Sequence, residues 1–212
     1  PLRRDAERNR QRILEAAREL FAQRGLAVTL NDVAHHAGVG VGTVYRRFPD
    51  KTHLIDDLFE QRLADLAALM EEALGEPDPL RGLTHFLERS VAMQAADRGL
   101  KDLMTGMPDG LERVCRIRDA LLPKAALLVA RAQAGGTLRD DISPEDLPVL
   151  QLMLGALIDS SHDVSPELWR RYLALLLRGM GSELGGPRQL PVEPLEPSQV
   201  GAVMSHRKSP RR

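Results

Sequence analysis

Two short amphipathic helices joined by a glycine-bounded turn are predicted within residues 29–51, and this pattern constrains the fold more than any other feature of the chain. Thr29 can cap the first helix, and Asp32, three residues later, can bond back to the freed backbone donors as in a capping box. Gly38 suits the left-handed conformation that ends a helix. Between these signals, apolar residues at helical spacing line one face: Leu30, Val33, Ala34 and Ala37.

The second helix is predicted to begin near Val41, after Gly40 as a permissive N-cap, and to stop at Pro49, with Asp50 as the cap of the next helix. Val44 and Phe48 are four residues apart and should face the protein. The outer surface is then formed by Val41, Gly42, Thr43, Tyr45, Arg46 and Arg47. Glycine inside a helix costs about 1 kcal/mol relative to alanine, so Gly42 needs a reason. Close approach of the backbone to DNA would be one, because this arrangement is typical of a helix-turn-helix.

Residues 10–58 resemble the DNA-binding domain of TetR-family transcriptional repressors, and the stretch AGVGVGTVYRRFPDK matches that family's signature. The spacing of five residues agrees at once: Gly38, Thr43, Tyr45, Phe48 and Lys51. The segment PELWRRYLALLLRGM also resembles the last helix of many actinobacterial members. The resemblance implies an all-α fold with an N-terminal three-helix DNA-binding domain and a larger helical domain for ligand binding and dimerisation.

The resemblance also implies which residues contact DNA: Thr29, Asn31, Val41, Gly42, Thr43, Tyr45, Arg47 and Lys51. Chemically, Arg47 can donate two hydrogen bonds to a guanine edge, whereas Tyr45 and Lys51 are better placed to hold phosphates. Val41 followed by Gly42 departs from a polar readout, since this pair offers few hydrogen bonds to bases.

Basic residues are concentrated in the first quarter of the chain. Residues 1–51 hold ten Lys/Arg against six Asp/Glu, although the net charge of the whole chain is −1. Five arginines precede the predicted reading motif: Arg3, Arg4, Arg8, Arg10 and Arg12. A solvated surface would explain scattered arginines, but a basic N-terminal arm that binds DNA is the preferred interpretation, with Arg3 and Arg4 as contacts.

Other function classes receive little support from the sequence. The chain contains no stretch of about 18 uninterrupted apolar residues and no apolar core near its start, so a cytoplasmic protein is expected. No nucleophile elbow, phosphate-binding glycine loop or HExxH pair is present, which predicts no enzyme. His35 and His36 are adjacent and point about 100° apart on a helix, so no metal is expected, and no cofactor is indicated. Cys115 is interpreted as core filler rather than a redox sensor.

Breakers and periodicity divide the chain into helices. The ranges expected are 5–23, 51–74, 80–95, a short piece around 100–104, 108–134 with an interruption at Pro123, 144–160 and 166–180. Two Ser-Pro-Glu segments are interpreted as N-caps followed by proline at the first helical position, and no strand pattern is found. The domains expected are residues 1–51, 52–182 and a Pro/Gly-rich tail at 183–212.

The last two predicted helices carry more apolar surface than one face needs. In the family the corresponding pair docks against its two-fold mate, so the resemblance implies a homodimer through Leu150, Leu154, Leu157, Trp169, Tyr172, Leu173, Leu176 and Leu177. A plain core remains the alternative. The resemblance also implies a ligand cavity in this half of the chain. Methionine-rich segments suit such a cavity, but they also suit an irregular core, and that alternative stays open. The candidate lining residues are Phe86, Met93, Met104, Met107, Cys115, Leu121, Met153 and His162.

These observations predict a homodimeric repressor that binds a palindromic operator in double-stranded DNA and is released by a small, largely apolar effector. Two alternatives remain open. One is a DNA-binding architectural or co-regulatory protein of the same fold that needs no ligand. The other is a helical enzyme or ligand carrier that has lost DNA binding.

Overall fold

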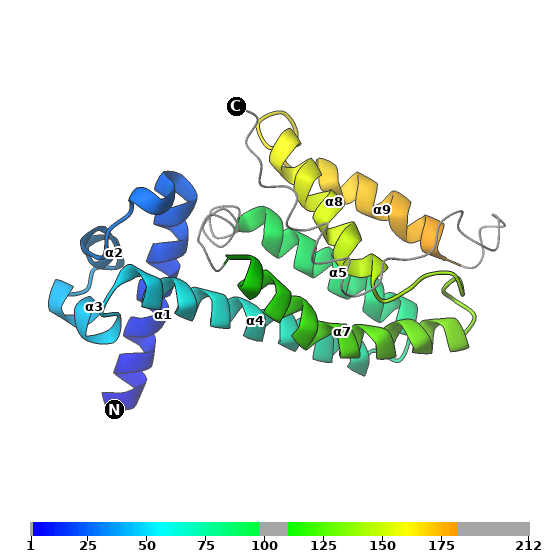
Figure 1. Cartoon of the computed structure of the whole chain (residues 1–212), viewed down its shortest axis with the longest axis horizontal. Helices are drawn as coiled ribbons and strands as arrows, with labels where there is room; N and C mark the ends of the chain where they lie inside the picture. The colour runs from blue at the N-terminus through cyan, green and yellow to red at the C-terminus, as the bar shows by residue number, and fades with distance from the viewer. Residues whose placement is uncertain (1, 98–109, 182–212) are drawn as a thin grey trace. The chain divides into compact units, whose positions relative to one another are not determined.

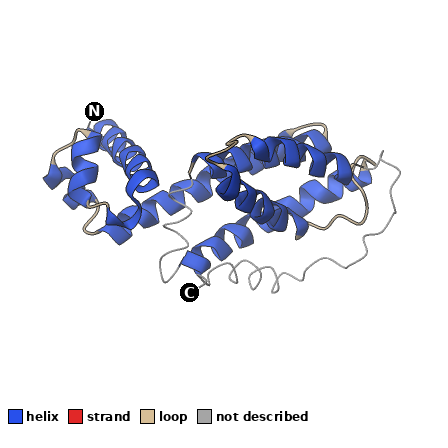
Figure 2. Cartoon of the chain, turned by 90° about the horizontal axis from the view of Figure 1, so that it is seen from above, coloured by secondary structure: helices blue, strands red, loops and turns tan. Residues whose placement is uncertain are grey.

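The computed structural model describes residues 2–97 and 110–181. Its helices, shown in Figures 1 and 2, are α1 (Leu2–Arg24), α2 (Leu30–Ala37), α3 (Val41–Arg47), α4 (Lys51–Gly75), α5 (Pro79–Ala96), α7 (Gly110–Ala134), α8 (Asp146–Ser161) and α9 (Leu168–Met180). A 3₁₀ turn, Gly25–Ala27, follows α1. The described residues contain no strand beyond an isolated bridge between Leu138 and Gly181, and the all-α prediction is confirmed.

The chain divides into two compact units. Unit 1 comprises Pro1–Ala64 with Asp97–Arg113, and unit 2 comprises Asp65–Ala96 with Val114–Arg212. Helix α4 runs from the first unit into the second without a break. The sequence predicted a domain boundary after residue 51, whereas the two compact units divide within α4, between Ala64 and Asp65. The predicted helix around residues 100–104 and the tail at 183–212 lie outside the described residues, as do Met104 and Met107.

Unit 1 is built around α1, which packs on α2, while α2 packs on α3. The apolar face of α1 is buried, with Ile13, Leu14 and Phe21 each 1% exposed, and Val33 of α2 and Val44 of α3 are buried as well. The first half of α4 adds Leu54, Ile55, Leu58 and Phe59, all at most 1% exposed. Burial of an aliphatic or aromatic side chain stabilises by about 1.5–3 kcal/mol, so these contacts hold α1, α2 and α3 in one arrangement.

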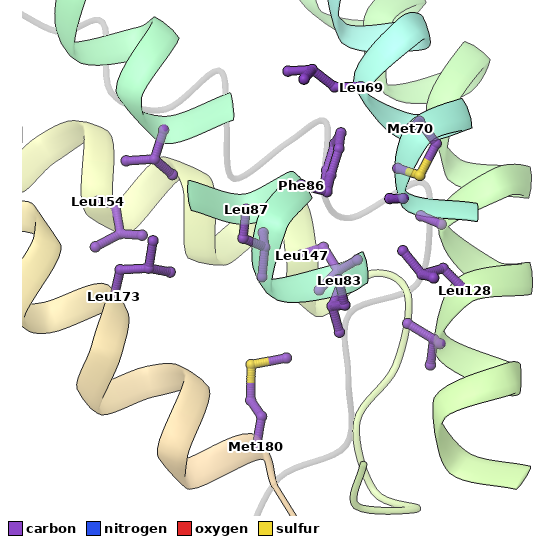
Figure 3. Packing of buried hydrophobic residues seen from close by; sticks show 14 of the residues in the cluster. Leu69, Met70, Leu83, Phe86, Leu87, Leu128, Leu147, Leu154, Leu173 and Met180 are labelled. Carbon is purple, nitrogen blue, oxygen red and sulfur yellow. The ribbon is translucent and has the colours of Figure 1, made fainter. Parts of the chain in front are cut away.

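Unit 2 has a second core, to which each of its described helices contributes. Figure 3 shows leucines, methionines and Phe86 from α4, α5, α7, α8 and α9 converging on one cluster. Helices α8 and α9 form a hairpin that lies against α5, and they run side by side in Figure 1. Trp169, the only tryptophan of the chain, is 1% exposed within this core.

Helix α7 corrects the predicted interruption at Pro123, because it is continuous through that residue. Proline removes one backbone hydrogen bond and crowds the preceding turn. Pro123 is exposed, so water can satisfy the freed carbonyl, while Ala125, Leu128 and Val129 on the following turns are buried and hold the helix together.

The two Ser-Pro-Glu segments also correct the prediction, because α8 and α9 begin two residues later than expected, at Asp146 and Leu168. Each segment forms a turn that leads into its helix. In the first, the Ser143 N–H donates to Asp146 Oδ2 at 2.8 Å, and the Asp146 N–H donates to the Ser143 carbonyl at 3.0 Å. The proline thus belongs to the turn rather than to the helix.

The predicted dimer residues prove to be of two kinds. Leu154, Trp169 and Leu173 are at most 2% exposed and belong to the core of their own unit, so the prediction that these three form an intersubunit surface is wrong. Tyr172 is 46% exposed. The others are partly buried: Leu150, Leu157, Leu176 and Leu177.

The predicted cavity residues are likewise divided. Phe86 is buried, whereas Met93 and Leu121 are partly buried against the same core. Cys115 is partly exposed. Met153 is 53% exposed on α8, and His162 is exposed just after α8 ends, so neither lines a buried cavity within the chain. The sequence around Met153 and His162 resembles that around core residues. The apolar spacing of an amphipathic helix does not show which edge of its apolar face remains exposed after packing.

Candidate nucleic-acid interface

The start of α2 is set by the predicted capping box, which the structure confirms. The Asp32 N–H donates to Thr29 Oγ1 at 3.2 Å, and the Thr29 N–H donates back to Asp32 Oδ2 at 2.8 Å. The Thr29 hydroxyl donates to the same carboxylate oxygen at 2.7 Å. This hydroxyl bond, followed by the backbone bond and the charge of Arg24, lowers the pKa of Asp32 below its ordinary value. Thr29 therefore has a structural task in addition to its predicted contact with DNA.

The turn between α2 and α3 depends on Gly38, which has φ 63° and ψ 37°, the left-handed conformation predicted for it. The Gly38 and Val39 N–H groups donate to the carbonyls of His35 and Ala34. From α1, Arg12 Nη2 donates to the Ala37 carbonyl at 2.6 Å. A guanidinium at a helix C-terminus complements the negative end of the helix dipole. Arg12 thus fixes the turn from which α3 departs.

Helix α3 presents one buried and one open face. Val44 is fully buried and Phe48 is 1% exposed, as predicted, and together they fix the rotation of the helix. Gly40 caps it through its carbonyl, which accepts from the Thr43 and Val44 N–H groups. On the open face, Val41 is 36% and Tyr45 46% exposed, and Gly42, Arg46 and Arg47 are exposed as well. The open face is thus available to a partner that lies along α3.

Gly42 has no steric explanation among the residues that the structure describes. A Cβ atom built there would meet no atom within 4 Å. Its backbone is ordinary helix, so an L side chain would not be strained there. The glycine is consistent with the sequence-based interpretation that something outside the chain approaches this part of the backbone.

The cations around α3 differ in how far they are engaged. Lys51 Nζ donates to the Leu26 carbonyl at 2.6 Å, and Arg46 Nη2 donates weakly to Thr43 Oγ1 at 3.4 Å. Arg47 Nη2 lies 3.5 Å from Asp57 Oδ2, with its guanidinium 5.7 Å from the centre of the Phe48 ring. Asn31, at the start of α2, is exposed.

The arginines before the motif form no extended arm, because residues 2–24 are one helix. The predicted basic arm is corrected for the two arginines nearest the motif. Arg12 holds the α2 terminus, and Arg10 Nε donates to Asp57 Oδ2 at 3.0 Å. Burial disfavours the charge of Arg10, but Asp57 and Glu7 offset this and raise its pKa. Arg3 and Arg4 lie in α1, and their side chains are outside the described part of the structure.

Sequence reasoning missed His53 and Asp57, and it assigned Arg10 to a DNA-binding arm rather than to a contact with Asp57. The Asp50 cap of α4 was predicted, and Asp50 Oδ1 accepts from the His53 N–H at 3.0 Å and lies 2.9 Å from His53 Nδ1. The side-chain hydrogen bond lowers the pKa of Asp50 and raises that of His53. Arg10 and Asp57 are 47 positions apart, so no local sequence pattern predicts their contact.

Other chemistry receives no support from the described side chains. Within residues 2–97 and 110–181 no cluster of three or more His, Cys, Asp or Glu is arranged to hold a metal ion. His36 Nε2 lies 2.6 Å from Glu19 Oε2, and His35 is exposed. None of the described helices is both long and apolar enough to cross a membrane.

Comparison with known proteins agrees with this geometry. The family model described as bacterial regulatory proteins, tetR family, matches residues 13–58, and that of the SbtR-like transcriptional regulator C-terminal domain matches residues 78–182. An HTH-type transcriptional regulator of Staphylococcus aureus (strain USA300) is 46% identical over 54 residues. That match spans 25% of this chain and only 29% of the relative.

Solved structures resemble the chain over most of its length. A TetR transcription regulatory protein from Mycobacterium vanbaalenii is 32% identical, with a TM-score of 0.67 over 85% of this chain and 99% of that one. NalD, the secondary repressor of the MexAB-OprM multidrug efflux pump in Pseudomonas aeruginosa, is 25% identical, with a TM-score of 0.62 over 85% and 100%. These relatives are named as regulators, in agreement with the prediction that the chain is no enzyme. The chain belongs to the TetR family of bacterial transcriptional regulators.

Proposed function

We propose that the protein is a homodimeric repressor that binds a palindromic operator by placing the open face of α3 in the major groove. The observation that carries this proposal is the division of α3: Val44 and Phe48 are buried, while Val41, Tyr45 and Arg47 stay exposed on the same seven-residue helix. A recognition helix needs such a division, because its inner face must be rigid for its outer face to meet base edges. A protein with this task acts in the cytoplasm, where the bacterial chromosome lies.

The DNA half of the proposal is tested by selecting duplexes from a random library with the purified chain and measuring affinity by fluorescence anisotropy. Arg47→Ala is expected to weaken operator binding by about 1–3 kcal/mol and to relax preference at one base pair. Arg89→Ala, which removes an exposed arginine from α5 in unit 2, is the matched control and should leave affinity unchanged. Unaltered specific binding by Arg47→Ala would show that the recognition helix has been assigned wrongly.

The homodimer is supported by apolar surface on the α8–α9 hairpin. Met153 is 53%, Tyr172 46% and Leu175 49% exposed. Leu150 and Leu157 stand one turn from Met153 on α8, and Leu176 stands one turn from Tyr172 on α9, so helical spacing continues each exposed position into a stripe. A palindrome also requires two reading heads, about 34–36 Å apart.

Sedimentation velocity tests this assembly. Leu175→Glu should shift the protein from dimer to monomer, because a carboxylate would be buried without a partner. Leu127→Glu places the same charge on a 59% exposed leucine of α7 and should leave the dimer intact. A wild-type chain that sediments as a monomer at micromolar concentration would exclude the homodimer.

Release by a small apolar effector is the finer part of the proposal. Its support is the family's C-terminal domain in unit 2 and the partly buried Met93 and Leu121 beside the core. An effector that favours the non-binding state by about 1–3 kcal/mol would lower operator affinity about 5- to 150-fold. Operator binding unaltered across a broad library of hydrophobic and amphipathic compounds would favour the ligand-independent alternative.

A further inference from the structure

One carboxylate oxygen in unit 1 serves two guanidinium groups. Asp57 Oδ2, on α4, accepts from Arg10 Nε of α1 at 3.0 Å and lies 3.5 Å from Arg47 Nη2 of α3. All three helical segments belong to the same compact unit. The side chain proposed to meet a base edge is therefore in contact with an acidic residue of the helix behind it.

The contact of Asp57 with Arg10 is shorter and more buried than its contact with Arg47. This difference indicates which guanidinium holds the carboxylate in place. The Arg10 side chain is 19% exposed, and Arg10 also lies 3.2 Å from Glu7, so its guanidinium is held on two sides. The Arg47 side chain is 54% exposed, and its distance to Asp57 is 0.5 Å longer. Arg10 thus fixes the position of the Asp57 carboxylate, and Asp57 in turn offers Arg47 a weak attachment that can be broken.

We infer that Asp57 is a positioning residue for operator recognition, which holds Arg47 back from phosphates until a base edge offers paired acceptors. This inference rests on the proposed function, in which α3 enters the groove. An exposed ion pair is worth up to about 5-fold in an equilibrium constant. A bidentate contact between arginine and guanine is worth about 5- to 150-fold and can displace it, whereas a single phosphate gains little by doing so.

The consequence is that Asp57 raises specificity by lowering non-specific affinity. In wild-type protein Arg47 contributes little to binding of a random sequence, because it remains on Asp57. Without the carboxylate, Arg47 becomes one more cation available to any phosphate. Each added phosphate contact steepens the dependence of log affinity on log salt by about 0.9 on duplex DNA.

The test measures anisotropy over a potassium chloride series with two probes, the selected operator duplex and a random-sequence duplex of about 30 base pairs. Asp57→Asn is expected to bind the random duplex about 2- to 5-fold more tightly than wild type, with a salt slope steeper by about 0.9. Glu15→Gln, at an exposed acid on α1, is the charge-matched control and should show neither change. Asp57→Glu should restore the wild-type specificity ratio.

A second measurement uses no substitution at Asp57, so the inference can still be tested if the Asp57→Asn variant does not fold. Arg47→Ala should weaken operator binding but leave the random-duplex salt slope as in wild type. A slope flattened by about 0.9 would show that Arg47 already contacts phosphates, and the inference would be overturned.

The double variant Asp57→Asn/Arg47→Ala completes the cycle and should bind the random duplex as Arg47→Ala does. An Asp57→Asn effect that persists without Arg47 would show that Asp57 acts through another group, which also overturns the inference. Failure of the proposed function looks different, because Arg47→Ala would then leave operator binding untouched.

Discussion

The two compact units of this protein differ in how far apart in sequence their essential contacts lie. The reading motif of unit 1 is assembled from 22 consecutive residues, Leu30–Lys51, with its cap, turn and helix stop in order along the chain. The core of unit 2 gathers residues from Leu69 to Met180 on five helices. The reading motif of unit 1 can therefore be predicted from local sequence patterns, whereas the core of unit 2 can be described only from the tertiary structure.

The difference has a functional side. A recognition surface needs a fixed shape, and three hydrogen bonds of unit 1 provide it. The Asp32 N–H donates to Thr29 at the start of α2, and Arg12 donates to the Ala37 carbonyl at its end. Arg10 of α1 donates to Asp57 of α4. A regulatory domain needs a site for an effector and a surface for assembly. Those properties depend on which edges of α8 and α9 stay open, and only packing decides that.

The largest effect is expected when a large buried side chain is replaced by alanine in the core of one unit and then in that of the other. Phe48→Ala should destabilise unit 1 by about 3–5 kcal/mol and abolish operator binding, because the ring is buried under α3. Urea unfolding is followed by circular dichroism and by Trp169 fluorescence, which reports unit 2 alone. The fluorescence midpoint should move less than the dichroism midpoint.

Phe86→Ala in unit 2 is the matched control and should move the fluorescence midpoint instead. If both variants shift both signals equally, the two units unfold together, and the expectation that they differ in stability is wrong.

Thr29→Ala should cost about 0.5–2 kcal/mol of stability, because the capping box at the start of α2 is lost. The measurement is the urea midpoint by circular dichroism at neutral pH. Thr29→Ser keeps a hydroxyl at the cap and should stay close to wild type. An unchanged midpoint in Thr29→Ala would indicate that the observed hydrogen bonds add nothing net.

Gly42→Ala should act in opposite directions on stability and function. Alanine is favoured over glycine within a helix by about 1 kcal/mol, and the structure leaves room for the added Cβ atom. Operator affinity should nevertheless fall, because the methyl group would keep DNA from the backbone. Gly75→Ala, at the exposed end of α4 in unit 2, has equal space for the Cβ atom and should leave DNA binding unchanged. Equal affinities for the two variants would remove the proposed reason for Gly42.

The smallest effect concerns pH. Asp50 raises the pKa of His53 through its hydrogen bond, so the stability this pair contributes is complete below pH about 6.5 and is lost as pH rises through the raised value. A proton NMR titration of His53 should show the raised pKa. Asp50→Asn retains a good helix cap but should return the pKa of His53 toward the ordinary value. An identical titration in both proteins would remove Asp50 as the cause.

Sequence patterns predicted helix starts and stops best where one residue has a strong local reason. Thr29, Gly38 and Asp50 each behave as predicted, because caps and left-handed turns depend on a few neighbouring atoms. The same reasoning failed at Pro123, where packing of the following turns outweighs the missing hydrogen bond. It also assigned Trp169 to an intersubunit surface, although a buried and an interfacial tryptophan look alike in sequence.

The helix-turn-helix, the open face of its second helix and the all-α fold could all be predicted from the chain alone, because they follow from spacings of three and four residues and from local capping. Only the tertiary structure decided that Arg10 and Arg12 serve the scaffold and that one oxygen of Asp57 meets both Arg10 and Arg47. Such contacts join residues brought together by the burial of apolar faces, which is non-directional and selects no partner until the whole unit has packed. The open face of α3, which we propose as the DNA-binding surface, could therefore be predicted from the chain, whereas the contact of Asp57 with Arg47 could not.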